Sequence, residues 1–184
     1  EVRKERGETY SPAKGLGKNF ELMYVLADER DLVRLRTRHR DADVYVYPTV
    51  ATPRQSQALF VEMAGRMNEL SVDPEFYNTL TNNCTTNIQR HVNQLSRDRV
   101  RFSWRVLLPG FSPHYAYDLG LLDQRIPFED LKLLSLVTDL SETYHDAPNY
   151  SAMIRSRRPM IERLAARQPP DTMLGGRGER LLSR

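Results

Sequence analysis

The hydrophobic periodicity of the chain changes near residue 50, and this change limits the fold more than any other feature of the sequence. Before it, residues 43–47 and the second half of residues 31–38 alternate apolar and polar side chains, and residues 20–26 form a short apolar run. Period two is typical of half-buried strands, and Pro48 would end the last of them. We therefore predict an antiparallel meander over these segments, with one more strand within residues 2–10.

After residue 50 the apolar residues recur at helical spacing. Thr52 and Pro53 combine a good N-cap with a proline at the first helical position, which predicts a helix over residues 53–69. A second apolar stripe predicts a helix from residue 84 or 85 to Leu95. Strands followed by helices indicate the α+β class, with an antiparallel sheet packed against helices.

Beyond residue 107 the structural signals are short. Ser112 and Pro113 open a predicted helix that Gly120 would end, and residues 131–140 are apolar enough for another. The prolines and glycines that follow predict a flexible tail. We therefore divide the chain into a main domain over residues 1–125, a helical extension over residues 126–168 and the tail over residues 169–184.

Composition excludes several classes of protein. With 40% hydrophobic and 28% charged residues the chain is ordinary for a globular protein, and no apolar run reaches the roughly 18 residues that a membrane span needs. The start at Glu1 is charged and has neither a signal peptide nor a methionine, so we expect a fragment or mature piece with any targeting or anchoring segment upstream. A net charge of +3 without a recognisable motif argues against nucleic-acid binding.

The one cysteine, Cys84, lies at the predicted start of the second helix, within residues 77–87, Y-N-T-L-T-N-N-C-T-T-N. A single cysteine forms no internal disulfide and no ordinary zinc site, but a helix N-terminus favours thiolate over thiol. The N–H of Cys84, with the side chain of Asn83 or Asn82, could also hold the oxyanion of an attacked carbonyl. Alternatively, Cys84 is a small buried residue and the two asparagines only cap the helix.

A cysteine nucleophile of the papain type needs a histidine partner, and the four histidines of the chain do not supply one. His91 shares the helix with Cys84, but their separation in sequence places it about 10 Å along the helix axis, beyond a hydrogen bond. His39, His114 and His145 lie in a predicted turn, a helix start and a polar segment, where surface or capping roles are typical. The sequence therefore shows a candidate nucleophile without its base.

Three segments carry a resemblance to a known family: residues 76–88 (F-Y-N-T-L-T-N-N-C-T-T-N-I), residues 21–31 (E-L-M-Y-V-L-A-D-E-R-D) and residues 44–48 (V-Y-V-Y-P). In this order they resemble the Lnb N-terminal periplasmic domain family, long filed as a domain of unknown function, over residues 1 to about 120. The resemblance implies a thiol-dependent, papain-like fold of the permuted NlpC and lecithin retinol acyltransferase type. The family's name links it to N-acylation of bacterial lipoproteins with an acyl chain from phospholipid.

Carried over to this chain, the resemblance implies that Cys84 is the nucleophile and Asn83 its neighbour in the site. The family's histidine lies on an early strand that falls before Glu1, so the fold and the active site are expected to be N-terminally incomplete here. The implied protein is periplasmic and membrane-associated, and it transfers or hydrolyses an acyl group through a Cys84 thioester. Its substrate would be a phospholipid or lipoprotein, and no metal or organic cofactor is required. The alternative is a non-catalytic periplasmic module that binds an envelope partner.

Overall fold

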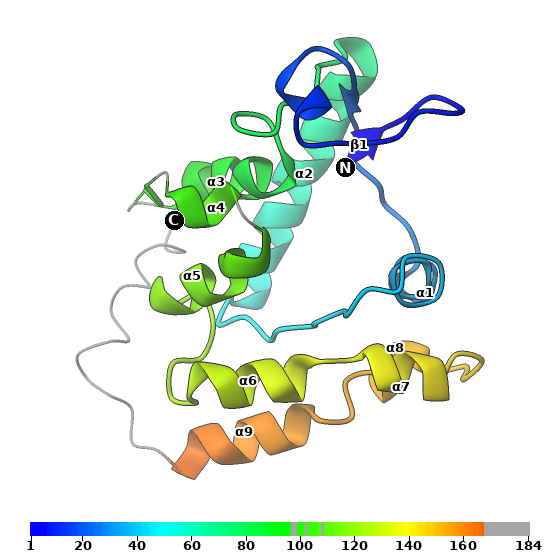
Figure 1. Cartoon of the computed structure of the whole chain (residues 1–184). Coiled ribbons are helices and arrows are strands. Elements are labelled where there is room, and N and C mark those ends of the chain that lie inside the picture. The colour runs from blue at the N-terminus through cyan, green and yellow to red at the C-terminus, as the bar shows by residue number, and fades with distance from the viewer. Residues whose placement is uncertain (97–98, 102, 108, 168–184) are drawn as a thin grey trace. The chain divides into compact units, whose positions relative to one another are not determined.

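The computed structural model describes residues 1–96, 99–101, 103–107 and 109–167 (Figure 1). The chain forms two compact units. Of the described residues, unit 1 contains 1–25 and 51–121, and unit 2 contains 26–50 and 122–167. The predicted flexible tail, residues 169–184, lies outside the described residues.

A small antiparallel sheet in unit 1 pairs β1 (Val2–Arg3) with β2 (Glu21–Leu22), so that Val2 lies opposite Leu22. An isolated bridge adds Phe76 to this sheet. The adjoining core consists of three buried side chains and the apolar groups packed on them: Phe20, Leu22 and Tyr77, with Val2, Tyr24 and Leu70. The strands predicted within residues 2–10 and 20–26 are therefore present, but each is only 2 residues long.

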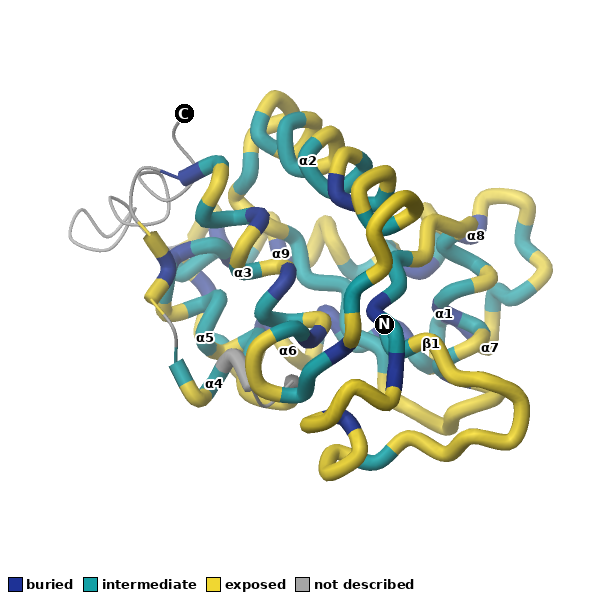
Figure 2. Tube along the Cα trace, turned by 90° about the horizontal axis from the view of Figure 1, so that it is seen from above, coloured by how far each residue is buried: buried dark blue, intermediate teal, exposed yellow. Residues whose placement is uncertain are grey.

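The longest helix of unit 1, α2 (Pro53–Val72), begins at the predicted cap. Thr52 Oγ1 accepts from Gln55 N at 3.3 Å, and Gln55 Oε1 accepts from Thr52 N at 2.7 Å, so both halves of a capping box are present. Arg66 is the one buried residue of this helix, and Figure 2 shows most of α2 as exposed or intermediate. The other helices in the described part of unit 1 are η1 (Lys14–Leu16), α3 (Cys84–Leu95), α4 (Trp104–Leu107), η2 (Pro109–Phe111) and α5 (Ser112–Asp118).

Unit 2 is built from short helices. In its described residues these are α1 (Glu29–Thr37), α6 (Phe128–Ser135), α7 (Thr138–Thr143), α8 (Tyr150–Met153) and α9 (Arg158–Arg167). Helix α1 packs on α7 and α8, and α6 packs on α9. The core between α1, α7 and α8 contains four buried side chains with apolar neighbours: Val33, Val137, Tyr150 and Ile154, with Val44, Val46 and Leu140.

The strand predicted over residues 31–38 is wrong, because residues 31–37 belong to α1 and Arg38 is its C-cap. Asp28 caps this helix by accepting the backbone N–H two residues further on, at 2.8 Å. Val33 and Thr37 are buried, whereas Leu35 between them is 38% exposed. Residues four apart share a helix face, so the alternating side chains fitted a helix as well as a strand.

The predicted meander is wrong as well, since residues 43–47 form only isolated backbone links within unit 2. Tyr45 forms a bridge with Leu136, and backbone bonds of 2.8 and 2.9 Å flank it. These bonds also explain why the helix predicted over residues 131–140 is interrupted between α6 and α7. The backbone around Leu136 is extended and pairs with the Tyr45 segment instead of continuing the helix.

The helices predicted over residues 53–69 and from residue 84 to Leu95 are confirmed. The short helix at Ser112 is confirmed too, and Gly120 follows its end with a φ of 73°, a left-handed conformation that glycine adopts without strain. The described residues thus form an α+β structure in which helices predominate. None of their helices is both long and apolar enough to cross a membrane.

An ion pair in unit 2 predicts how stability varies with pH. Both carboxylate oxygens of Glu29 accept from Arg155, and this hydrogen bonding holds the pKa of Glu29 below its ordinary value of 4.5. A lowered folded-state pKa contributes stability that is present above the unfolded value and lost as the pH falls through the folded value. We expect Glu29→Gln to lower the free energy of unfolding by about 1 kcal/mol near neutral pH, and by less in acid.

Urea unfolding near neutral pH and in acid, below about pH 4, measures this effect. Glu162→Gln is the matched control, because it removes an exposed pair with Arg158 in the same unit and should change stability little. An equal loss for Glu29→Gln at both pH values would show that the ion pair does not act in this way.

Candidate functional site

Cys84 is the first residue of α3, and its side chain is exposed. Asn83 precedes it as the N-cap: Asn83 Oδ1 accepts from Thr86 N at 2.8 Å, and Thr86 Oγ1 accepts from Asn83 N at 2.8 Å. This capping box fixes where the helix begins. The predicted position of the thiol at a helix N-terminus is confirmed, and the sulfur lies on the surface rather than in the core.

A tight turn leads the chain into Asn83. Asn78 and Asn82 pair across this turn, and Asn78 Oδ1 accepts from two backbone N–H groups inside it at 2.9 and 3.0 Å. Thr79 ties the turn to the N-terminal segment, because Thr79 N donates to Gly15 O at 2.8 Å. A Cβ on Gly15 would collide with Thr79 Oγ1, so the close approach favours glycine.

The side-chain amides of Asn82 and Asn83 both hold this turn. Asn82 Nδ2 donates to Phe76 O at 3.0 Å, and Asn83 Nδ2 donates to a backbone carbonyl four residues earlier at 2.7 Å. By contrast, the N–H groups of Cys84 and Thr85 have no acceptor among the described residues. The donors available to an oxyanion at Cys84 are therefore backbone groups of the first helical turn, not the asparagine side chains.

His91 lies further along α3 and is engaged by other residues. It is 1% exposed, its Nε2 lies 2.7 Å from the Tyr24 hydroxyl, and its Nδ1 lies 3.4 Å from Glu62 Oε1. Both ring nitrogens are thus occupied, which agrees with the exclusion of His91 as the partner of Cys84. Burial raises the pKa of Tyr24, so its hydroxyl keeps its proton at neutral pH and can donate.

A chain of polar side chains joins His91 to the start of α3, and the sequence analysis missed it. The Tyr24 hydroxyl donates to Asn87 Oδ1 at 3.2 Å, and Asn87 Nδ2 donates to Asn83 O and to Asn82 Oδ1, both at 2.9 Å. Asn83, Asn87 and His91 are four residues apart and share one face of the helix. That spacing was the available signal, but Tyr24 comes from a distant segment that the spacing does not reveal.

The other three histidines belong to different elements. His114 is in α5, where its Nδ1 lies 2.7 Å from Arg105 Nη2. His39 follows α1 and His145 follows α7, both in unit 2, so the hairpin turn predicted around His39 is wrong. Within the described ranges, no group of three or more His, Cys, Asp and Glu side chains could hold a metal ion.

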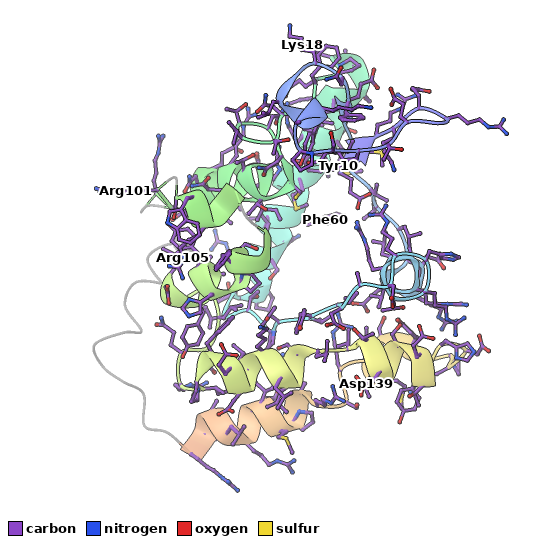
Figure 3. The ribbon with its side chains drawn as sticks, in the orientation of Figure 1. Tyr10, Lys18, Phe60, Arg101, Arg105 and Asp139 are labelled. Atoms are coloured by element: carbon purple, nitrogen blue, oxygen red, sulfur yellow. The ribbon has the colours of Figure 1, made fainter. Side chains whose placement is uncertain are left out.

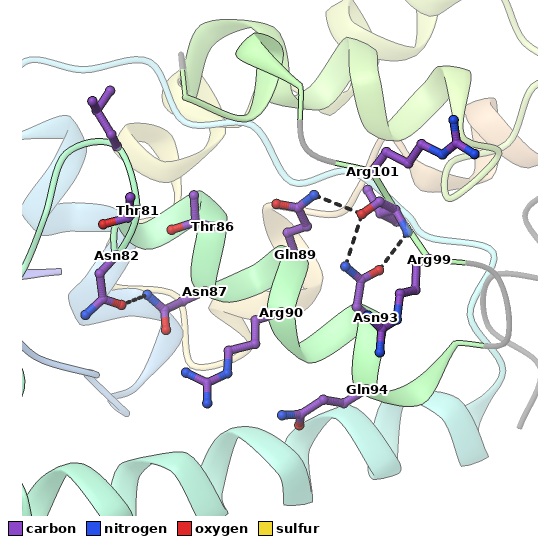
Figure 4. A pocket seen from close by; sticks show the side chains of 12 residues that line it. Thr81, Asn82, Thr86, Asn87, Gln89, Arg90, Asn93, Gln94, Arg99 and Arg101 are labelled. Atoms are coloured by element: carbon purple, nitrogen blue, oxygen red, sulfur yellow. Dashed lines mark hydrogen bonds between the residues drawn. The ribbon is translucent and has the colours of Figure 1, made fainter.

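A groove of about 1270 Å³ lies along α3 in unit 1 (Figure 4). The segment around Val100 forms part of its wall and is fastened to α3. Asn93 Nδ2 donates to Val100 O at 3.1 Å, Val100 N donates to Asn93 Oδ1 at 2.6 Å, and Gln89 Nε2 adds a bond of 3.0 Å to Val100 O (Figure 4). Cys84 is not among the residues that line this groove. The sequence analysis did not identify the groove.

The candidate site of this α+β structure is thus an exposed cysteine at the start of a capped helix. The chain belongs to the Lnb N-terminal periplasmic domain family, which matches residues 1–110 and so includes the whole turn before Cys84. This family is a periplasmic domain, which places the chain on the periplasmic side of the membrane. No curated protein and no solved structure matches the chain.

The contacts of Asn83 predict a cost for replacing it. Asn83→Ala removes the acceptor for Thr86 N and a donor to the preceding turn, so we expect the free energy of unfolding to fall by about 1–2 kcal/mol in urea titrations. Asn83→Asp keeps the acceptor for Thr86 N, so its free energy of unfolding should fall by less than half as much as that of Asn83→Ala. If both variants lost the same amount, the N-cap hydrogen bond would not be the stabilising contact.

Proposed function

We propose that this domain catalyses thiol-dependent acyl transfer or hydrolysis in the bacterial envelope, with Cys84 as the nucleophile. The observation that carries the proposal is the exposed sulfur at the first residue of α3, beside two backbone N–H groups without an acceptor among the described residues. The unpaired N–H groups at a helix N-terminus stabilise an anion that develops next to them. An acyl carbonyl brought to this point would meet both a nucleophile and oxyanion donors.

In the proposed reaction, the Cys84 thiolate attacks an ester or amide carbonyl, which forms a C–S bond and an oxyanion. The N–H groups of Cys84 and Thr85 stabilise this oxyanion. When the tetrahedral intermediate collapses, the bond to the alcohol or amine leaving group breaks and that group takes up a proton. An amine, in transfer, or water, in hydrolysis, then attacks the thioester and releases the thiolate. Asn83 is a positioning residue, because its contacts set where α3 begins.

The proton transfers of this reaction need a base. His91 is held by Tyr24 and Glu62, so we propose instead the histidine that the family resemblance places on a strand before residue 1. A papain-like fold of the permuted type belongs to the same proposal. It is supported by the presence of the β1–β2 sheet and the cysteine-bearing helix α3 in one compact unit.

The family resemblance and the periplasmic location also suggest the substrates. We propose a phospholipid as the acyl donor and the amino group of a lipoprotein as the acceptor. Both are present at the surface of a bacterial membrane, where a periplasmic domain can reach them. Neither substrate requires a metal ion or an organic cofactor for attack by a thiolate.

A second candidate function is a non-catalytic periplasmic module that binds an envelope partner. The side chains of Asn82, Asn83 and Asn87 all donate to backbone carbonyls of the turn or the helix start. A helix start needs such contacts whether or not it bears a catalytic residue, which favours this alternative. Under this alternative, Cys84 has no chemical role.

Thiol accessibility coupled to activity separates the two functions. We expect iodoacetamide to alkylate Cys84 in the native chain at a rate close to that in the urea-unfolded chain, because the side chain is exposed. Alkylation mapped to Cys84 by peptide mass spectrometry should abolish acyl transfer by the full-length protein. Alkylation as slow as that of a buried thiol, or full activity after complete alkylation, would refute the enzymatic function.

A further inference from the structure

The groove along α3 is cationic. Among the described residues, its lining includes Arg90, Arg99 and Arg101 and no Asp or Glu. All three arginines are exposed, and none of their guanidinium groups makes a hydrogen bond or ion pair with another described residue. Glu75 attracts Arg90 only through space, and Glu75 itself is already paired with Arg66 at 2.6 Å. The groove therefore carries positive charge that the described part of unit 1 does not neutralise.

The orientation of these arginines suits an extended anion better than a small one. Figure 4 shows the Arg90 and Arg101 side chains pointing in different directions, so the two guanidinium groups do not converge on a single point. Each planar guanidinium can bind one phosphate group through two parallel N–H groups. Arginines that face apart would thus contact separate phosphates of an array.

An exposed aromatic pair lies in the segment that follows Arg101. Trp104 and Phe111 stack edge to face, with ring centroids 5.3 Å apart, and they remain 58% and 49% exposed. This segment is tied to Arg101, because the Tyr115 hydroxyl donates to Arg101 O at 3.1 Å. Arg105, labelled with Arg101 in Figure 3, covers the Tyr115 ring at 5.2 Å. Exposed aromatic side chains that follow arginines closely in the chain are typical of segments that contact lipid headgroups.

The cationic groove is separate from the thiol. Asn93, on its wall, follows Cys84 by nine residues, and at about 100° per residue it lies on the opposite side of α3. Cys84 itself does not line the groove, so binding of a ligand by the three arginines does not require the thiol.

We propose that Arg90, Arg99 and Arg101, together with the Trp104–Phe111 pair, form a docking face for an anionic lipid surface. The guanidinium groups bind lipid phosphates, and the aromatic pair enters the headgroup layer. The periplasmic location of the family puts a membrane surface within reach of this face. The docking face works without Cys84, so Cys84→Ala binds lipid as the unmodified chain does, and failure of the docking proposal leaves the thiol chemistry untouched.

The chain contains one tryptophan, so its fluorescence reports on Trp104 alone. Vesicles of equimolar phosphatidylglycerol and phosphatidylcholine, titrated into the 184-residue chain, should shift the emission to shorter wavelength and carry the protein down on sedimentation. Vesicles of phosphatidylcholine alone should do neither. Each arginine near an anionic membrane surface raises the partition coefficient about fivefold. Arg99→Gln combined with Arg101→Gln should therefore lower the partition coefficient about 25-fold.

The charge-matched control is Arg6→Gln combined with Arg54→Gln, two exposed arginines of unit 1 outside the groove. This control should keep binding within about twofold of the unmodified chain, apart from the general effect of net charge. Three results would overturn the proposal: equal binding to both kinds of vesicle, an equal loss in the two double variants, or the same spectral shift with inorganic phosphate or poly-glutamate in place of vesicles.

Discussion

Cys84→Ala and Cys84→Ser, made in the full-length protein, should each lower kcat/KM for acyl transfer by about a thousandfold or more. Alanine removes the atom that forms the thioester. Serine keeps the shape of the side chain, but its hydroxyl is far less ionised than a thiol and is a much poorer nucleophile without a dedicated base. Because Cys84 is exposed and the cap is made by Asn83 and Thr86, neither variant should lose much stability.

The matched control for this prediction is Thr85→Val. Its hydroxyl lies within hydrogen-bonding range of the sulfur, at 3.8 Å, yet the proposed reaction uses only the backbone N–H of this residue. We expect activity within about tenfold of the unmodified protein. If Cys84→Ala kept as much acyl-transfer activity as Thr85→Val, Cys84 would not be the nucleophile.

Leu131→Ala should be the most destabilising of the simple core changes in unit 2. Leu131 in α6 is 0% exposed, and large-to-small replacements at such positions cost about 2–5 kcal/mol through lost burial and the remaining cavity. Leu133→Ala provides the control in the same helix, since Leu133 is 68% exposed and its replacement should cost less than about 1 kcal/mol. Urea unfolding of both variants measures the difference. Similar losses at the two positions would contradict the packing of α6.

The elements that the sequence predicted well are those with local signals. The Thr52 cap lies next to the helix that it starts, and the predicted start at Pro53 is confirmed. The second helix begins at Cys84, one of the two starts that the sequence left open. The strand predicted over residues 31–38 was wrong because positions four apart match both a period of two and one face of a helix. The local signal for a helix is the N-cap at Asp28. The extended segment around Tyr45 depends on a partner ninety-one positions away, which no local pattern contains.

The candidate site likewise contains residues with a local sequence signal and residues that depend on distant partners. Cys84 and Asn83 were identified from the sequence, because a cysteine after an asparagine cap is a local pattern. The Tyr24 hydroxyl that links His91 to Asn87 comes from more than sixty residues away, so the polar chain behind the helix start required the structure. The sequence also offered the side-chain amides of Asn82 and Asn83 as oxyanion donors. In the structure both amides donate to backbone carbonyls within the turn, which leaves the backbone N–H groups as donors.

The most direct test of a Cys84 thioester is its capture. The full-length protein is mixed with a phospholipid that carries a labelled acyl chain, in the absence of an amine acceptor, and is quenched in acid before peptide mass spectrometry. We predict that the label appears on the peptide that contains Cys84, is released by neutral hydroxylamine, and is absent from Cys84→Ala. Acyl transfer that proceeds while the Cys84 peptide never carries the label would contradict the proposed mechanism.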